Sequence, residues 1–267
     1  MALHPLQGPL DNLVDYLADA RRLHDVATIL REQQSTERRN NGQATGAGSP
    51  TVHHKSLNRA VVVASVGAME AFFEDLALTA VDLTPGLAQP EDWFHIETKG
   101  SRAGMIQTPS PYNVRKMLWV FFRYDPRSDW DITVSVSPAE TTSGHGSTWR
   151  GALQQVAGPD AAKFLHAMVK VRHGFAHQDH AQKPPHEPGI VNLTPKGKVA
   201  VHSHHAENSM SALVQVAIQS AHGLSNELDL AGTFRWSKKM DEADWEWLLK
   251  GTQAASLVAS HWRGHPF

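Results

Sequence analysis

The segment 53–83 constrains the fold of this chain more than any other part of the sequence. Almost every residue from 60 to 66 is apolar, and the segment as a whole follows a helical period. A helix that is apolar on nearly all sides is buried by other elements instead of lying on the surface. We therefore expect a central helix with other helices packed around it.

The rest of the sequence supplies those partners. Apolar residues recur at three- and four-residue steps over 10–33, which predicts an amphipathic helix there. Further helices are expected at 112–124, 161–177, 206–228 and 241–260, and a helical turn or two at 147–156.

The segments between these helices are long and partly irregular. A polar, Gly-rich loop is predicted over 34–50, and 84–111 is an excursion without a clean period. Alternating residues predict a short strand at 132–136 and a small β-hairpin at 190–201. The expected fold class is all-α, a helical bundle with long loop insertions and a small β-hairpin after helix 161–177.

Composition narrows the function classes. The 267 residues include 25 Lys and Arg against 27 Asp and Glu, a formal net charge of −2. This balance argues against nucleic-acid or membrane binding through overall charge, but it leaves room for a local basic groove. The absence of Cys excludes disulfides, thiolate nucleophiles and Cys-based zinc sites. We find no signal-peptide pattern and no apolar run of membrane-spanning length, so we expect a cytoplasmic protein without a membrane partner.

The segment 164–180 (FLHAMVKVRHGFAHQDH) contains most of the candidate catalytic residues. Arg172 falls on its apolar face, seven residues after Leu165, where a cation is costly unless it is paired. Glu70 is a lone carboxylate in the apolar segment 61–73 and is the candidate partner. We expect a buried Arg172–Glu70 contact, which could belong to a catalytic site or be purely architectural.

His177 follows Arg172 by five residues. On a straight helix the two side chains are roughly 140° apart around the axis and about 7.5 Å apart along it. They therefore do not share a face. If they act on one atom, either the helix ends between them or two copies of the helix meet, as in a twofold dimer.

Histidine is abundant, with 17 residues, and two groups stand out. The first group has helical i, i+4, i+7 spacing and consists of His173, His177 and His180. The second fits the end of a hairpin and consists of His202, His204 and His205. The first spacing could bind a metal, but no carboxylate base lies between its histidines. Because chance clustering is expected among so many histidines, we predict no metal site and no cofactor.

The segment 171–177 (VRHGFAH) resembles the Arg-x4-His signature of HEPN-domain ribonucleases. Segment 57–76 (LNRAVVVASVGAMEAFFEDL) is similar to the second helix of that family, and 108–130 to the following helix and loop of its RiboL-PSP-type branch. One difference is His173, where Asn is commoner. The resemblance covers roughly 10–228. We expect a HEPN-like bundle domain at 1–230 and a C-terminal helical extension at 231–267, packed on the bundle.

The resemblance implies a homodimer in which two Arg–His motifs share a cleft and cleave RNA without a metal, leaving a cyclic phosphate. It also implies a toxin or antiviral (phage) defence effector, with a cognate antitoxin or sensor protein as a further partner.

The chemistry of RNA cleavage suits the motif residues. RNA supplies its own nucleophile, the 2′-OH. His177 would transfer protons, because its ordinary pKa is near neutral, and Arg172 would hold a phosphate oxygen. His173 would orient the phosphate or act as the second proton-transfer group, and Glu70 would hold Arg172 in place.

RNA binding would need local cations. The candidates are Lys170, Arg115, Lys116 and Arg123. The last three lie near Trp119, Phe121, Phe122 and Tyr124, and such interleaving can clamp a backbone and stack bases. In the plainer interpretation, which we favour for the aromatic residues, they form core and the cations form a solvated face.

Two other functions remain open. In a non-catalytic HEPN dimerisation or partner-binding module, the Arg172–Glu70 contact would be structural and His177 would cap the end of its helix. The exposure of His177 and of the Arg172 guanidinium separates these two functions. If both groups open onto a dimer cleft, an enzyme is favoured; if both are enclosed within one protomer, the module is favoured. A His-metal hydrolase is a third, weaker hypothesis.

Overall fold

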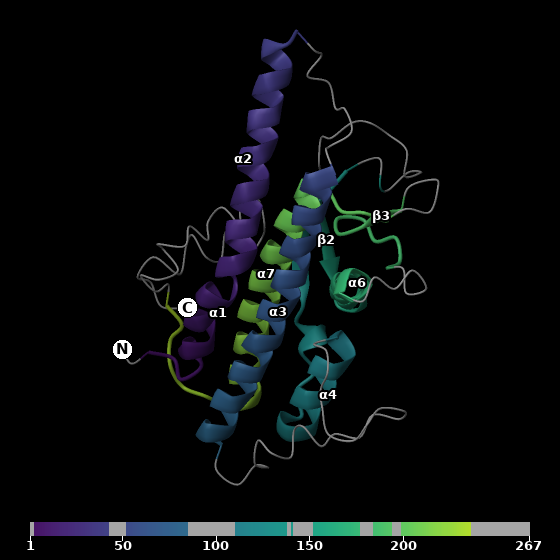
Figure 1. The fold of residues 1–267 in the computed structure, drawn as a ribbon. Helices are drawn as coiled ribbons and strands as arrows, with labels where there is room; N and C mark the ends of the chain where they lie inside the picture. Colours follow the sequence, from purple (N-terminus) through teal and green to yellow (C-terminus); the bar gives the residue numbers. More distant parts are fainter. Residues whose placement is uncertain are drawn as a thin grey trace.

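A computed structural model describes residues 3–42, 52–84, 110–137, 140, 152–176, 184–193 and 199–235. These residues are mostly helical and include two small antiparallel sheets (Figure 1). The expected helical fold is therefore confirmed in its coarse form, and it carries more β structure than predicted.

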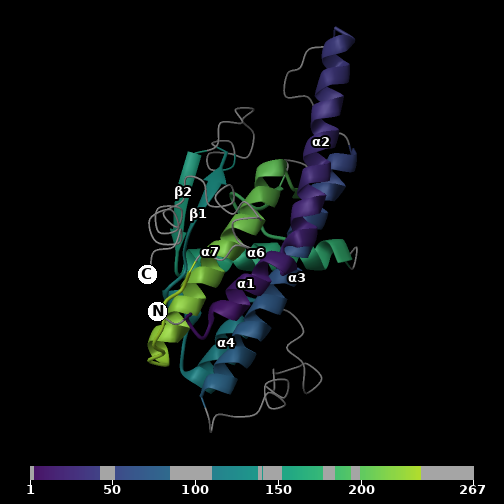
Figure 2. The ribbon, with the colours of Figure 1, turned by 90° about the vertical axis from the view of Figure 1, so that its left-hand side faces the viewer.

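Helix α3 (Val52–Leu83) lies at the centre of the helices, as predicted. It contacts α1 (Gln7–Tyr16), α2 (Ala18–Asn40), α6 (Pro159–Ala176) and α7 (Ser203–Glu227). The views in Figures 1 and 2 show α3 and α7 side by side along much of their length. Apolar side chains around α3 are buried, among them Val62, Met69, Phe72, Phe73 and Leu76.

The helix predicted at 10–33 is two helices separated at Leu17, and the second is longer than expected. α2 runs to Asn40, so the predicted loop over 34–50 is wrong for its first residues. Gln, Glu and Arg dominate this last part and favour a helix even without a core to pack against. Figure 1 shows the end of α2 projecting beyond the other helices.

The other helices match their predictions where they are described. α4 (Pro111–Phe122) begins at Ser110, whose side chain accepts a hydrogen bond from the Asn113 N–H at 3.2 Å. It ends at Arg123, which has a left-handed φ of 59°. α6 and α7 correspond to the helices predicted at 161–177 and 206–228. The helix predicted at 241–260 and nearly all of 84–111 lie outside the described residues.

The strand predicted at 132–136 is confirmed as β1 (Asp131–Val136). Its antiparallel partner, β2 (Ala152–Ala157), lies where we expected a helical turn, so that prediction is wrong. Ala, Leu and Gln in β2 favour a helix locally, but backbone pairing with β1 overrides this preference. The small hairpin is confirmed as β3 (Asn192–Leu193) and β4 (Val199–Ala200).

Side-chain amides of α7 bind the backbone of β1, which Figure 2 shows beside that helix. Each amide donates to a carbonyl and accepts from the N–H of the same residue; the pairs are Asn208 with Ser135, Gln215 with Thr133, and Gln219 with Asp131. The six distances lie between 2.6 and 3.0 Å. The amides therefore satisfy the backbone groups on the side of β1 opposite β2.

The chain that follows α7 returns to the start of α1. The ring of Phe234 stacks on His4 at 3.8 Å, and the Arg235 N–H donates to the Gln7 side chain at 2.8 Å. These residues are the described beginning of the predicted extension 231–267, and the rest of it lies outside the described part of the chain. None of the described helices combines the length and the apolar character needed to cross a membrane.

Candidate functional site

Packing of α6 against α3 brings Arg172 to Glu70, and the predicted pair is confirmed. The Nη1 of Arg172 donates to Oε2 of Glu70 at 2.9 Å. The expectation that this contact is buried is wrong, because the two side chains are 28% and 27% exposed. Leu165 and Met168 of α6 fill the core, whereas the charged pair lies at the rim of the α3–α6 contact.

The half-exposed guanidinium of Arg172 has further N–H donors besides the one that binds Glu70. Within the described residues, Glu70 is the one recorded partner of Arg172, and it engages one terminal nitrogen. The planar guanidinium can bind a phosphate through two parallel hydrogen bonds while a carboxylate holds its other edge. The pair can therefore present a fixed cation to an anionic substrate.

Two polar residues lie close to Arg172 in the sequence of α6. Lys170 and His173 are half-buried, and His177 lies outside the described residues, since the described part of α6 ends at Ala176. Burial and the charge of Lys170 lower the pKa of His166, which lies one turn before Lys170. Arg172 and Lys170 thus place positive charge on α6, although their spacing of two residues puts them on opposite sides of the helix.

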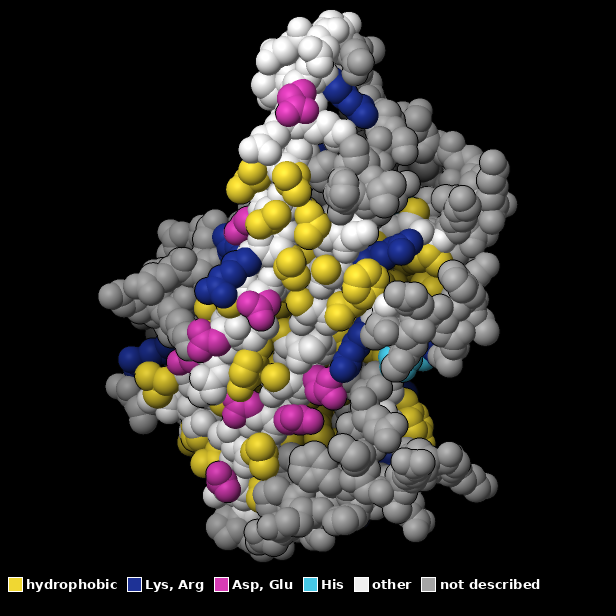
Figure 3. Space-filling view, in the orientation of Figure 1, with side chains coloured by type: hydrophobic (Ala, Val, Ile, Leu, Met, Phe, Trp, Pro, Cys, Tyr) yellow, Lys and Arg dark blue, Asp and Glu magenta, His cyan; other side chains and the backbone are white. Residues whose placement is uncertain are grey.

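Acidic groups are concentrated on the neighbouring helices. Burial and the charge of Glu70 raise the pKa of Glu74, one turn further along α3. Figure 3 shows further carboxylates gathered over α1 and α3 on the face that it presents. These carboxylates would repel an anionic ligand, in contrast to the cations of α6.

Two of the predicted RNA-binding cations share one face of α4 with two exposed aromatic rings. Helical spacing places Arg115 and Lys116 on the same side as Tyr112 and Trp119, and Arg123 follows the helix as an exposed residue with a left-handed backbone. Tyr112 and Trp119 are 58% and 42% exposed. The Arg115 guanidinium lies 6.0 Å from the centroid of the Trp119 ring, and its Nε donates to Asp125 at 2.9 Å.

The aromatic residues of this region divide into two groups. Phe121, Phe122 and Tyr124 are buried, as the plainer interpretation predicted. That interpretation is wrong for Trp119, which is 42% exposed beside Arg115. α4 therefore offers the kind of surface that stacks bases and contacts phosphates.

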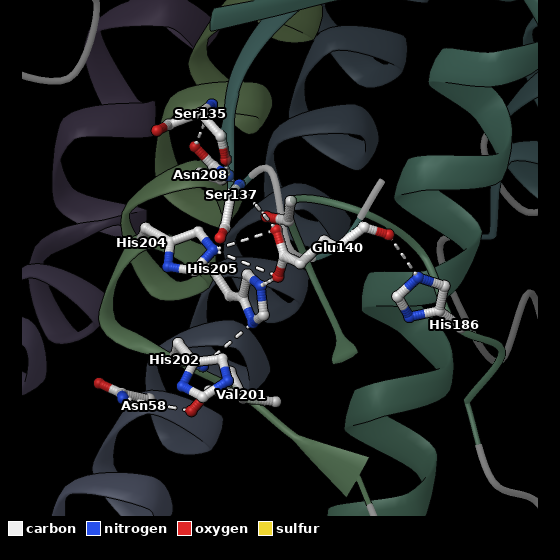
Figure 4. A network of polar contacts seen from close by, with 11 residues as sticks. Asn58, Ser135, Ser137, Glu140, His186, Val201, His202, His204, His205 and Asn208 are labelled. Carbon is white, nitrogen blue, oxygen red and sulfur yellow. Dashed lines mark hydrogen bonds and ion pairs between the residues drawn. The ribbon is translucent and has the colours of Figure 1, made fainter. Parts of the chain in front are cut away.

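A second polar cluster, formed by Glu140, His204 and His205, lies near the start of α7 (Figure 4). His205 Nε2 contacts Oε1 of Glu140, and His204 Nε2 lies 3.3 Å from both carboxylate oxygens. The Ser137 N–H donates to Oε2 of Glu140 at 3.0 Å. The Glu140 and His205 side chains are almost fully enclosed, whereas that of His204 is 19% exposed.

Burial and hydrogen bonding set the charge states of this cluster. Burial lowers the pKa of His205 to about 3, so its imidazole is neutral at pH 7. Burial alone would raise the pKa of Glu140, but hydrogen bonds from His204 and His205 outweigh that effect and hold it below its usual range. The carboxylate is therefore ionised inside the protein.

Sequence reasoning found only part of this cluster. His202, His204 and His205 stand out in the sequence, and they lie just after β4, at the start of α7. Glu140 was missed because nothing in the segment 137–143 (SPAETTS) distinguishes it. Of the other histidine group, only His173 lies within the described residues.

The sequence matches no protein-family model, and no curated protein or solved structure shows significant similarity to it.

Proposed function

We propose that this chain is a metal-independent endoribonuclease of the HEPN type. The observation that supports this most is the Arg172–Glu70 pair, in which a guanidinium is held at 2.9 Å and remains 28% exposed. A half-exposed ion pair contributes little to stability, so stability alone gives little reason for this contact. An exposed, oriented arginine beside a histidine-rich segment suits recognition of a phosphodiester.

In the proposed reaction, the 2′-oxygen of RNA attacks the adjacent phosphorus and the 5′-oxygen leaves. The products are a 2′,3′-cyclic phosphate and a 5′-hydroxyl. Arg172 binds a non-bridging oxygen and stabilises the charge that develops in the transition state. His177 transfers a proton to or from the reacting oxygens, with His173 as the second group, and Glu70 orients Arg172.

Substrate binding would extend from Lys170 on α6 to the exposed face of α4. The net charge of −2 gives no general attraction to RNA, so contacts must be local. Trp119 and Tyr112 supply stacking surfaces, and the adjacent cations supply phosphate contacts.

On a straight helix, five residues turn a side chain by roughly 140°, so the spacing of Arg172 and His177 in the sequence supports a homodimer in which the two motifs meet. A cytoplasmic ribonuclease that cleaves the RNA of its own host needs restraint. This supports a role as a toxin or antiviral effector with an antitoxin or sensor as partner.

The test is cleavage of labelled RNA by the purified full-length chain, with and without EDTA. Arg172→Ala and His177→Ala should each abolish cleavage, and His166→Ala, which removes an exposed imidazole from the same helix, serves as the matched control. Circular dichroism and size-exclusion chromatography establish that each variant is folded. Undiminished cleavage by a folded His177→Ala protein would rule out the mechanism. A dimeric wild-type protein that cleaves no RNA would favour the partner-binding module.

A further inference from the structure

We propose that Glu140, His204 and His205 bind a single Zn²⁺ ion that joins the chain after β1 to the first turn of α7. This proposal is independent of the ribonuclease proposal. It concerns a second site, built from different residues.

The geometry of the three side chains is the first argument. One ring nitrogen of each histidine and a carboxylate oxygen of Glu140 all lie within 4.8 Å of one another, and Nε2 is the atom that each histidine directs at Glu140. Figure 4 shows both imidazoles and the carboxylate directed toward one point. Residues that are distant in the sequence thus converge through the fold, as metal ligands commonly do.

The chemistry of the donor set is the second argument. Imidazole nitrogen and carboxylate oxygen are ordinary zinc ligands, and two histidines with one glutamate are a known ligand combination. The Ser137 N–H donates to the carboxylate at 3.0 Å and orients it, as outer groups do around metal sites. The partly exposed His204 marks the side from which an ion would enter and where water would complete a tetrahedral shell.

Charge is the third argument. The Glu140 side chain is only 2% exposed, and no Lys or Arg is recorded against it in the described part of the chain. A buried carboxylate is costly unless a cation accompanies it. A dication held between two imidazoles supplies that charge.

Loading the site must move one proton. The Nδ1 of His205 accepts a hydrogen bond from the His202 N–H at 3.0 Å, so without an ion the imidazole proton is on Nε2 and points toward Glu140. Zn²⁺ needs the lone pair of Nε2. The proton then resides on Nδ1, and the His202 N–H must turn to another acceptor. The number of protons on His205 is unchanged, but the environment of the His202 amide changes.

The experiment uses the full-length chain, freed of metal with EDTA and dialysed. We expect it to take up a stoichiometric Zn²⁺ that a chromophoric chelator measures, and to melt at a higher temperature with Zn²⁺ than without it. Co²⁺ in its place should give the visible absorption of a tetrahedral site. His204→Gln, the least buried substitution, should lose the ion and the thermal shift. His166→Gln controls for the other histidines.

Equal Zn²⁺ uptake by wild-type and His204→Gln proteins would overturn the proposal. If His204→Gln does not fold, Co²⁺ absorption and the His202 amide resonance of the wild-type protein test the proposal. Absence of Co²⁺ absorption, or a His202 amide resonance that Zn²⁺ leaves in place, would show that the three side chains form a hydrogen-bonded network without an ion.

Discussion

The side-chain amide of Gln215 on α7 binds both backbone groups of Thr133 on β1. Its Oε1 accepts from the Thr133 N–H at 2.8 Å, and its Nε2 donates to the Thr133 carbonyl at 3.0 Å. Both residues are buried. The orientation of the small sheet on the helices therefore depends on amide side chains as well as on apolar packing.

Gln215→Leu should destabilise the fold strongly. Leu has a similar volume but leaves a buried N–H and a buried carbonyl of Thr133 without partners, a loss of about 2–4 kcal/mol in the free energy of unfolding. Gln219→Leu is the matched control, because the half-buried Gln219 site admits water to Asp131. Urea unfolding followed by circular dichroism measures both variants, and equal losses would contradict this explanation.

Arg172→Lys should lower RNA cleavage by about 100-fold or more while leaving the fold intact. Lysine keeps the charge but cannot bind phosphate and Glu70 through a planar fork. The half-exposed pair contributes little to stability, at most about 1 kcal/mol, so the melting temperature should change little. Cleavage rates and thermal melts, measured together, separate the two effects. A large stability loss with normal cleavage would assign the pair to architecture.

Trp119→Ala should weaken binding of single-stranded RNA by about 5- to 100-fold, because stacking on an aromatic ring stabilises each bound base. Val120→Ala is the matched control, since Val120 is the next residue of α4 and has a similar exposure, 44% against 42%. Fluorescence anisotropy of a labelled RNA measures both. Equal affinities for the two variants would exclude Trp119 from the binding surface.

Acid should destabilise the protein in part through His222. Burial lowers the pKa of His222 to about 4, from an ordinary value of 6.5. Between these values the unfolded chain binds a proton that the folded chain does not, so stability falls as the pH falls from 6.5 toward 4. The slope from this group is at most about 1.4 kcal/mol per pH unit. His222→Gln should flatten the decline in unfolding free energy, measured by urea titration at several pH values.

EDTA should separate the two proposals. It should lower the melting temperature by removing Zn²⁺ from the Glu140 cluster, and it should leave the rate of RNA cleavage unchanged at 25 °C, where the protein stays folded. Thermal scans and cleavage assays on the same samples provide the comparison. Loss of cleavage without any thermal effect would place a metal in the reaction and contradict the proposed mechanism.

The helices could largely be predicted from sequence, because the periodic apolar residues that indicate each helix are also the residues that pack in the core. The central position of α3 follows from the apolar segment 60–66, which is buried against several helices. β2 could not be predicted in this way, because its residues favour a helix and only the distant β1 makes it a strand. The break at Leu17 was not predicted either, because the apolar periodicity of the sequence continues through it.

The two polar sites also differ in how far the sequence could predict them. The Arg172–Glu70 contact was predictable, since each charge is conspicuous in an apolar helix. Its half-exposed position was not, because exposure depends on what covers the α3–α6 contact. Glu140 stands among small polar residues, and only the fold brings it to His204 and His205.

The amides that α7 directs at β1 also bear on how these molecules behave toward one another. A strand with an unpaired edge is a template on which a strand from another molecule can add. Asn208, Gln215 and Gln219 occupy that edge of β1 with groups that cannot propagate a sheet. The same three side chains that fix the sheet to the helices thus protect the protein from aggregation through β1.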